Sequence, residues 1–509
     1  MIIRRNFLHS FKVNTGLGLS LRVLVGYVMV ATISLALAKV APLAALLVAG
    51  GGSILLGWEI CRGFESLAPR HYGIGLSSHA VMRWHWMTVA VLCVNYAWFF
   101  VKDEPPAIGI LLLIGILACR WWFTGHLFPL TPLNIPVAVL LSVSLLSGTV
   151  FSMNPAATYP KVYGLMFGVL FFCEVVYGLQ YSNNLIFWIV GLEFVGLGVI
   201  GLGLLGADSF PNELFDSSVL LRYVPRLPLN LPRSAGGFHP NGLAGVIIYL
   251  IPIYVVVLTG NFFRGLKYGR VLVGLTVITL SSSVCLLLLS QSRGALSATF
   301  ITGITLFLAL KEKYRLSLAF ITLSLLALVT LYFFGFYTTL AKFLAAEQST
   351  AVNLASYTVR QSFWQLGLEI WQTFPLTGIG IGAFDFVVYN YFFDQYPDWI
   401  LQDAGGWFPH VHNELLQIAI DLGVLGFTAF IAILAGVVRT AWHTFSLTAD
   451  TSTRHLILGL AAGLLAHQIF GFTDVVYLGS KPGVVFWVMM GLVAALYRRE
   501  LSNPLSDKD

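Results

Sequence analysis

The chain has 509 residues, of which 57% are hydrophobic and only 10% are charged, and its mean hydropathy is +0.82. A soluble protein carries about a quarter charged residues, so this composition argues against a soluble globular enzyme or binding module. The net charge of +6 comes without a dense block of Lys and Arg, which argues against a nucleic-acid partner.

Long apolar runs recur along the whole chain and predict an all-α, polytopic integral membrane protein. Each run reaches the roughly 18 residues that a helix needs to cross a bilayer. Residues 271–289, for example, are continuously apolar and do not alternate as barrel strands would. We expect about 12–14 transmembrane helices, with candidate spans that start near residues 21, 42, 85, 107, 134, 161, 184, 240, 270, 294, 315, 413, 456 and 482.

The N-terminal run and the cysteines have simple interpretations. The run resembles a signal peptide, but more spans follow at once, so we expect a retained first helix. The cysteines lie in or beside apolar runs and show neither a disulfide framework nor metal-ligand spacing. We expect inert buried thiols at Cys61, Cys93, Cys119, Cys173 and Cys285.

The distribution of positive charge predicts the orientation of the chain. An even number of spans with both ends in the cytoplasm places most of the 29 Lys and Arg residues in cytoplasmic loops. The opposite orientation would violate the positive-inside rule at nearly every short loop. We therefore expect a multi-pass membrane protein whose two longest connections, 206–239 and 341–412, lie on the outer face.

The second long connection contains a predicted amphipathic helix. Its apolar residues fall on one helical stripe, formed by Phe363, Leu366, Ile370, Trp371 and Phe374. Pro375 stops the helix. The pattern favours a helix that lies at the membrane interface and begins just after Arg360.

Four polar features share the outer face in this topology. They are Arg233 with residues 236–245, Arg293, Arg360 and the His410–Asn413 cluster. Guanidinium groups form forked hydrogen bonds to phosphate and keep their charge at low dielectric. The convergence therefore suggests a site for an anionic, lipid-borne substrate, although any one arginine can also be an interface anchor.

The other motifs have weaker functional readings. His410 and His412 form a potential metal pair, but no third ligand is evident, so we expect no metal. The glycines of residues 378–382 follow no predicted strand and favour a tight re-entry of the loop toward the membrane over a nucleotide site. Ionisable residues inside spans are functional candidates by default, with internal pairing an equal explanation for the first two: Glu174, Glu193, Asp421 and His467.

Several of these motifs together resemble the O-antigen ligase and polymerase superfamily. The segment "HNELLQIAIDLGVLGFT" is similar to the family signature, in which a His and a small polar residue precede Gly-x-x-Gly, here Gly423 and Gly426. The other similar segments, in chain order, are "GFHPNGLAG", "SQSRGAL", "VRQSFWQLGLEIWQTFPLTGIGIGAF" and "GFTDVVYLGSKPG". The resemblance covers about 236–430 and extends to 471–483. It divides the chain into an N-terminal membrane region (1–235), a core (236–440) and a C-terminal hairpin with a tail (441–509).

The resemblance implies a metal-independent, inverting glycosyltransferase of the bacterial inner membrane, without a cofactor and with its active site on the periplasmic face. Its donor would be a glycan on undecaprenyl diphosphate and its acceptor a hydroxyl of a glycan or glycolipid. The family pattern, carried onto this sequence, implies that Arg360 and Arg293 hold the diphosphate and that His412 is the base. It also implies substrate-binding roles for Arg233, His410, Asn413, Asn241 and Asp474.

A small-solute transporter, of the inorganic-carbon-uptake type proposed within the same superfamily, is the alternative. Transporters place paired ionisable groups or broken helices near the middle of the membrane. Glu193 lies near the middle of its span and favours this alternative. Most of the polar residues lie at one face, which favours the enzyme.

Overall fold

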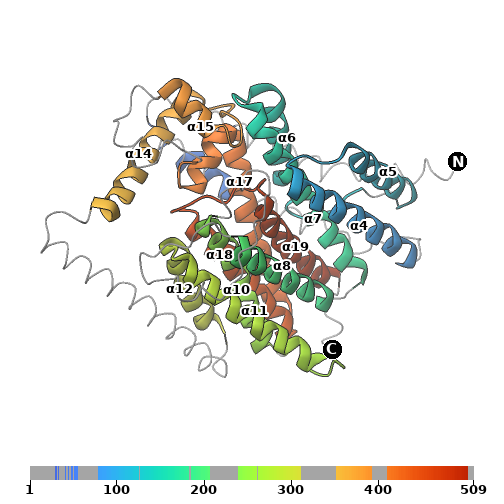
Figure 1. Ribbon diagram of the computed structural model, residues 1–509. Coiled ribbons are helices and arrows are strands. Elements are labelled where there is room, and N and C mark those ends of the chain that lie inside the picture. Colours follow the sequence, from blue (N-terminus) through green and yellow to red (C-terminus); the bar gives the residue numbers. More distant parts are fainter. Residues whose placement is uncertain are drawn as a thin grey trace, which may run out of the picture.

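The computed structural model describes residues 78–124, 127–182, 185–206, 239–260, 262–310, 351–392 and 410–502, with scattered positions between 29 and 55. All regular elements in these ranges are helical, which confirms the predicted fold class. Seven of the described helices are long and apolar enough to cross a membrane. Figure 1 shows them as a bundle, with α14 and α15 together at one end near α6.

Helices occur at every predicted span that the described ranges contain, while the predicted starts near 21, 42 and 315 lie largely outside them. The helices are α4 (Ser78–Lys102), α5 (Ala107–Thr124), α6 (Asn134–Leu146), α7 (Pro155–Ser182), α8 (Leu185–Gly206), α10 (Pro240–Thr259), α11 (Gly269–Ser290), α12 (Arg293–Ala309), α14 (Ala351–Thr373), α15 (Phe384–Val387), α17 (Glu414–Leu447), α18 (Thr451–Phe470) and α19 (Val484–Ser502).

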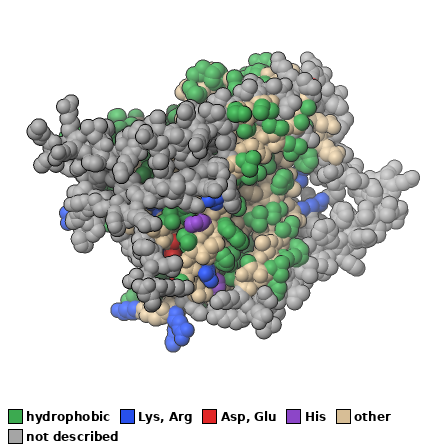
Figure 2. Space-filling model, turned by 180° about the vertical axis from the view of Figure 1, so that it is seen from behind, with side chains coloured by type: hydrophobic (Ala, Val, Ile, Leu, Met, Phe, Trp, Pro, Cys, Tyr) green, Lys and Arg blue, Asp and Glu red, His purple; other side chains and the backbone are tan. Residues whose placement is uncertain are grey.

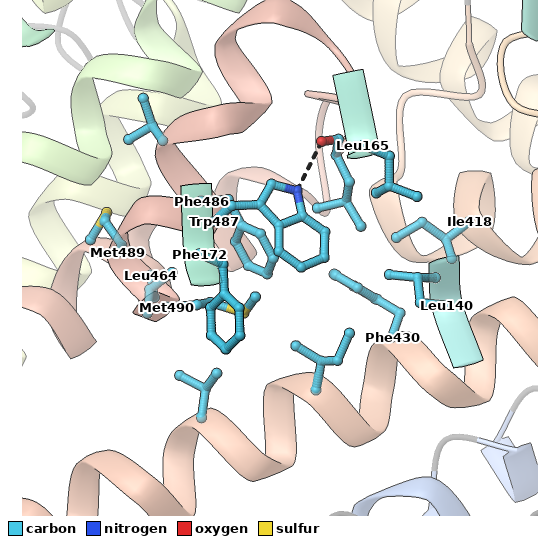
Figure 3. Packing of buried hydrophobic residues seen from close by; sticks show 14 of the residues in the cluster. Leu140, Leu165, Phe172, Ile418, Phe430, Leu464, Phe486, Trp487, Met489 and Met490 are labelled. Carbon is cyan, nitrogen blue, oxygen red and sulfur yellow. Dashed lines mark hydrogen bonds between the residues drawn. The ribbon is translucent and has the colours of Figure 1, made fainter. Parts of the chain in front are cut away.

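The core of the described bundle forms around α17 and α19. The most extensive helix contacts pair α19 with α7 and α10 with α18, and α17 packs against α6. Trp487 of α19 is fully buried, and its indole Nε1 donates a hydrogen bond to the carbonyl of Leu478 at 3.1 Å (Figure 3). This bond satisfies the polar atom of a large side chain and so favours a single packing of the core.

The outer helices expose large hydrophobic side chains, as a bilayer requires. Trp122 of α5 is 82% exposed, and Val94 of α4 and Val271 of α11 are also mostly exposed. Figure 2 shows hydrophobic side chains over much of the described surface, with few Lys and Arg among them. Such an apolar surface is stable only when lipid covers it.

Helix α17 is broken at Gly423, which has the left-handed φ of +63°. The break frees two carbonyl groups, and the loop before α15 satisfies both. Ile379 N–H donates to Ile420 O at 2.9 Å, and Gly380 N–H donates to Asp421 O at 3.0 Å. The loop re-enters against the helix, as the glycines of residues 378–382 predict.

Glycine is needed on both sides of this contact. A Cβ on Gly378, whose φ is +66°, would lie 2.4 Å from the carbonyl of Asp421. A Cβ on Gly423 would lie 2.2 Å from the carbonyl of Leu376. The positive φ and the close approach each exclude other residues there.

The amphipathic helix is α14, and it corrects two details of the prediction. It includes Ala351, and no Pro or Gly interrupts the residues between Ala351 and Arg360. Arg360 therefore lies inside the helix. The stripe residues Phe363, Leu366, Ile370 and Trp371 are at most 4% exposed and belong to the main core. The stripe thus packs on protein, chiefly α17, instead of lipid.

The connections of the described bundle separate into two groups that agree with the predicted alternation. At one end, Lys481 Nζ lies 2.9 Å from Asp103 Oδ1, and Met153 N–H donates to Ile379 O. At the other end, the Ser452 hydroxyl donates to Gly260 O at 3.4 Å. Each contact joins loops that the positive-inside rule places on the same side.

We expect cysteine labelling to assign these two ends to the two faces of the membrane. In a cysteine-free background, single cysteines at Glu104 and Phe472 should react with a membrane-impermeant maleimide in intact cells. Those at Leu266 and Leu447 should react only after permeabilisation, because their loops belong to the Lys- and Arg-rich end. Reaction of Glu104→Cys and Phe472→Cys from opposite faces would contradict the topology.

The intramembrane acids show two different environments. The carboxylate of Glu174 accepts from Arg120 at 2.5 Å and lies 2.9 Å from His85 Nδ1, with all three side chains at most 1% exposed. Internal pairing therefore explains Glu174. Glu193, which is also 1% exposed, lies beside Thr276 and Thr279 of α11.

Candidate functional site

His410 and His412 lie in the turn that leads into α17. Asn413 is the N-cap of this helix, and its Oδ1 accepts a hydrogen bond from Leu416 N–H at 3.0 Å. His412 precedes the cap with a φ of +54°, in the left-handed region that few non-glycine residues adopt. Such a conformation persists only where the surroundings enforce it, and it is common at functional sites.

A carboxylate from the C-terminal part of the chain faces both rings. Asp474 lies in the turn after α18, and its Oδ1 is 3.4 Å from His412 Nδ1 and 3.5 Å from His410 Nε2. The Asp474 side chain is 8% exposed, whereas that of His412 is 26% exposed. The site therefore has a buried carboxylate behind a histidine that remains open to a substrate.

The contacts of His410 indicate its tautomer. His412 N–H donates to His410 Nδ1 at 3.3 Å, so a neutral His410 carries its proton on Nε2, which faces Asp474. Burial lowers the pKa of His410 to about 3, although Asp474 opposes this shift. His410 is accordingly neutral at physiological pH, and its Nε2–H faces the carboxylate.

Asp474 is held in its charged form. Burial by itself raises its pKa, but the two neighbouring histidines outweigh burial, so the pKa lies well below its usual range. Val475 N–H also donates to Oδ1 at 2.9 Å. An ionised carboxylate 3.4 Å from Nδ1 favours the His412 tautomer whose Nε2 lone pair is free.

Glu414 is the nearer acid in sequence, but it faces another partner. Its Oε1 lies 3.2 Å from His467 Nε2, and both side chains are at most 2% exposed. His467 also stacks on Tyr249, with ring centroids 4.2 Å apart. The carboxylate that faces His412 is therefore Asp474 and not Glu414.

Two of the predicted arginines belong to elements that reach this turn. Arg293 is half-buried at the first position of α12, and a Cβ on the next residue, Gly294, would lie 2.0 Å from the Thr473 hydroxyl. Arg360 lies one turn before Phe363 in α14, and the Phe363 ring centroid is 6.0 Å from that of His412. The fold therefore brings both segments to one end of the bundle.

The remaining predicted residues have mixed outcomes. Asn413 uses its oxygen for the helix cap, which leaves its amide nitrogen for a substrate. Asn241 lies in the first turn of α10, two residues after the N-cap His239. Arg233 lies outside the described residues.

Sequence reasoning missed Lys161 and Tyr477. Lys161, from α7, lies with its Nζ 5.0 Å from the ring centroid of Tyr477, and its charge contributes to the lowered pKa of His410. Tyr477 also lies near His410, with ring centroids 6.3 Å apart. Lys161 belongs to the N-terminal region, where hydropathy was the only signal, so no sequence pattern could have identified it.

The expectation that the histidine pair lacks a third metal ligand is wrong. Donor atoms of His410, His412 and Asp474 all lie within 4.8 Å of one another, a spacing that can hold a metal ion. The tautomer of His410 does not suit a metal, because its Nε2 carries the proton while Nδ1 accepts a backbone N–H. Within the described residues, the donor set fits a proton-bonded cluster better.

Part of the chain matches a known protein family. Residues 275–431 match the family model described as O-antigen ligase, and this segment contains Arg293, Arg360, His410 and His412. The match ends close to the predicted end of the resemblance and begins later than residue 236. No curated protein matches the chain.

Proposed function

We propose that this protein transfers a glycan from undecaprenyl diphosphate to an acceptor hydroxyl in surface polysaccharide. The proposal rests on residues 275–431, which match the family model of O-antigen ligases, a family of enzymes. The reaction would invert the anomeric carbon and need no metal. The observation that best supports this function is the His412–Asp474 contact of 3.4 Å at the end of the bundle that α12 and α14 also reach.

His412 is the proposed general base. A sugar hydroxyl is a weak nucleophile, and a positioned base typically contributes about 10²–10⁴-fold to the rate. The Asp474 carboxylate, 3.4 Å from Nδ1, favours the tautomer with its proton on Nδ1 and so leaves the Nε2 lone pair for the acceptor. Asp474 is therefore assigned to positioning His412 instead of binding substrate directly.

Arg293 and Arg360 are the proposed ligands of the diphosphate. In the transfer, the acceptor oxygen forms a bond to the anomeric carbon as the bond from that carbon to the diphosphate oxygen breaks. The hydroxyl proton passes to His412 Nε2, and the released diphosphate carries the negative charge. Two guanidinium groups stabilise that charge better in a partly buried site than in water.

One feature of the structure favours the transporter alternative, and the hydrogen bonds around that feature argue against it. The break in α17 at Gly423 is of the kind that lines ion sites in transporters. Here the freed carbonyls of Ile420 and Asp421 accept hydrogen bonds from the neighbouring loop, which leaves them engaged. The break is therefore better explained as the seat of that loop.

Purified protein in detergent provides the test. With a polyprenyl-diphosphate glycan and an acceptor glycolipid, it should release polyprenyl diphosphate and form the extended product without any ion gradient. EDTA should leave the rate unchanged. Solute uptake by proteoliposomes, together with no transfer in detergent, would favour the transporter.

We expect Asp474→Asn to reduce kcat by about 10²–10⁴-fold with little change in donor affinity, because the wrong His412 tautomer then faces the acceptor. Initial rates over a range of donor concentrations would measure both parameters. Asp450→Asn is the matched control, since Asp450 caps α18 at the opposite end of the bundle. Equal losses in the two variants would contradict the role of Asp474.

A further inference from the structure

The strained turn at His412 is fixed on both sides. After it, the Asn413 cap begins α17. Before it, Val411 is fully buried, and its N–H donates to Gln417 Oε1 at 2.8 Å. A residue at a φ of +54° between two such anchors cannot relax toward the ordinary helical or extended regions without breaking one of them.

Gln417 connects this turn to the break in α17. Its side chain is fully buried, and its Nε2 donates to Asp421 Oδ1 at 2.8 Å. The Asp421 carboxylate also accepts from Gly382 N–H, and its carbonyl accepts from Gly380 N–H at 3.0 Å. The histidine turn, the broken helix and the glycine loop are therefore joined through two side chains.

The Val411 N–H decides which way the Gln417 amide points. A backbone N–H only donates, so it requires Oε1 of Gln417 on its side, and Nε2 then faces Asp421 Oδ1. A flipped amide would set a donor against the Val411 N–H, and that contact would be lost.

We infer that Gln417, held between the Val411 N–H and Asp421, is a positioning residue that sets the backbone of His412 through the Val411 N–H. Without this anchor the turn relaxes and the imidazole leaves its place beside Asp474. The inference rests on the proposed function, because it assigns Gln417 to the geometry of the proposed base. A displacement of about 1 Å is enough to reduce a rate about 100-fold.

The first test is Gln417→Leu, which removes the acceptor and the donor at similar volume. We expect kcat to fall by about 100-fold while the KM for the polyprenyl-diphosphate donor stays within about twofold. Gln180→Leu is the matched control, because Gln180 is an exposed glutamine near the end of α7. An unchanged kcat in Gln417→Leu would overturn the inference.

The second test exchanges the amide of Gln417 and the carboxyl group of Asp421, so that the hydrogen bond between the two side chains can form again in the reverse direction. Gln417→Glu alone sets two carboxylates together and should be as impaired as Gln417→Leu. Adding Asp421→Asn lets the introduced amide donate to the introduced carboxylate and accept from Gly382 N–H, while the other carboxylate oxygen accepts from Val411. We expect the double variant to recover most of kcat. A double variant no better than Gln417→Glu would contradict the inference, even if Gln417→Leu fails to fold.

A measurement without substrate separates this inference from the proposed function. Carbethoxylation of His412 by diethyl pyrocarbonate, followed by mass spectrometry, reports the environment of the ring. The rate should change several-fold in Gln417→Leu and return toward the wild-type rate in the double variant. A wild-type chain that transfers no glycan but shows this pattern would overturn the function and keep the anchor, whereas identical rates would overturn the anchor.

Discussion

Replacing His412 with Ala is expected to reduce turnover by about 10²–10⁴-fold, which corresponds to roughly 3–5 kcal/mol of barrier. The acceptor hydroxyl then loses the group that takes its proton. Donor binding should remain largely intact, because the proposed diphosphate ligands lie on α12 and α14. Transfer rates and donor-lipid affinity of the purified variant would measure the two effects separately.

His410→Ala should be milder. His410 is neutral, since its pKa is about 3, and its protonated Nε2 faces Asp474, so it offers no base of its own. His443→Ala, in the last turns of α17, controls for the loss of a histidine far from the site. Normal turnover in His412→Ala, or a loss matched by the loss of folded protein, would refute the assignment of the base.

Arg360→Ala is expected to abolish transfer while the protein still inserts into the membrane. Arg360→Lys should restore little of the rate, because an ammonium group does not replace a bidentate fork on a diphosphate. The sequence placed Arg360 just before the start of the helix, but in the structure it lies within α14. Its effect on the diphosphate therefore comes from the guanidinium group alone and not from a helix N-terminus.

The measurement for Arg360 is donor affinity together with the transfer rate. Arg264→Ala provides the control, because Arg264 is exposed in the loop between α10 and α11. Full activity of Arg360→Lys would show that Arg360 is only an anchor. A loss of detergent-stable protein in Arg360→Ala, with normal specific activity of the remainder, would lead to the same conclusion.

The fold class was accessible from the sequence because it depends on local composition. Apolar runs of bilayer length form helices wherever lipid cannot satisfy the backbone, so helices occur at every predicted span that the described ranges contain. The cap at Asn413 and the stop at Pro375 were equally local, since each depends on the residue type and its immediate neighbours.

The partners of the site residues were not accessible in this way. Glu414 is the acid nearest to His412 in sequence, but the acid that faces His412 is Asp474, from the turn after α18. Lys161 reaches the same place from α7. No periodicity relates such distant positions, because packing between helices decides which turns meet.

The stripe of α14 shows the same division. Its spacing predicted one apolar face, and Leu366 and Trp371 indeed lie on it. An apolar face is equally stable against lipid and against another helix, so the pattern by itself could not choose between them. Only the tertiary structure placed that face on α17, because the broken helix and the re-entrant glycine loop create the surface on which it packs.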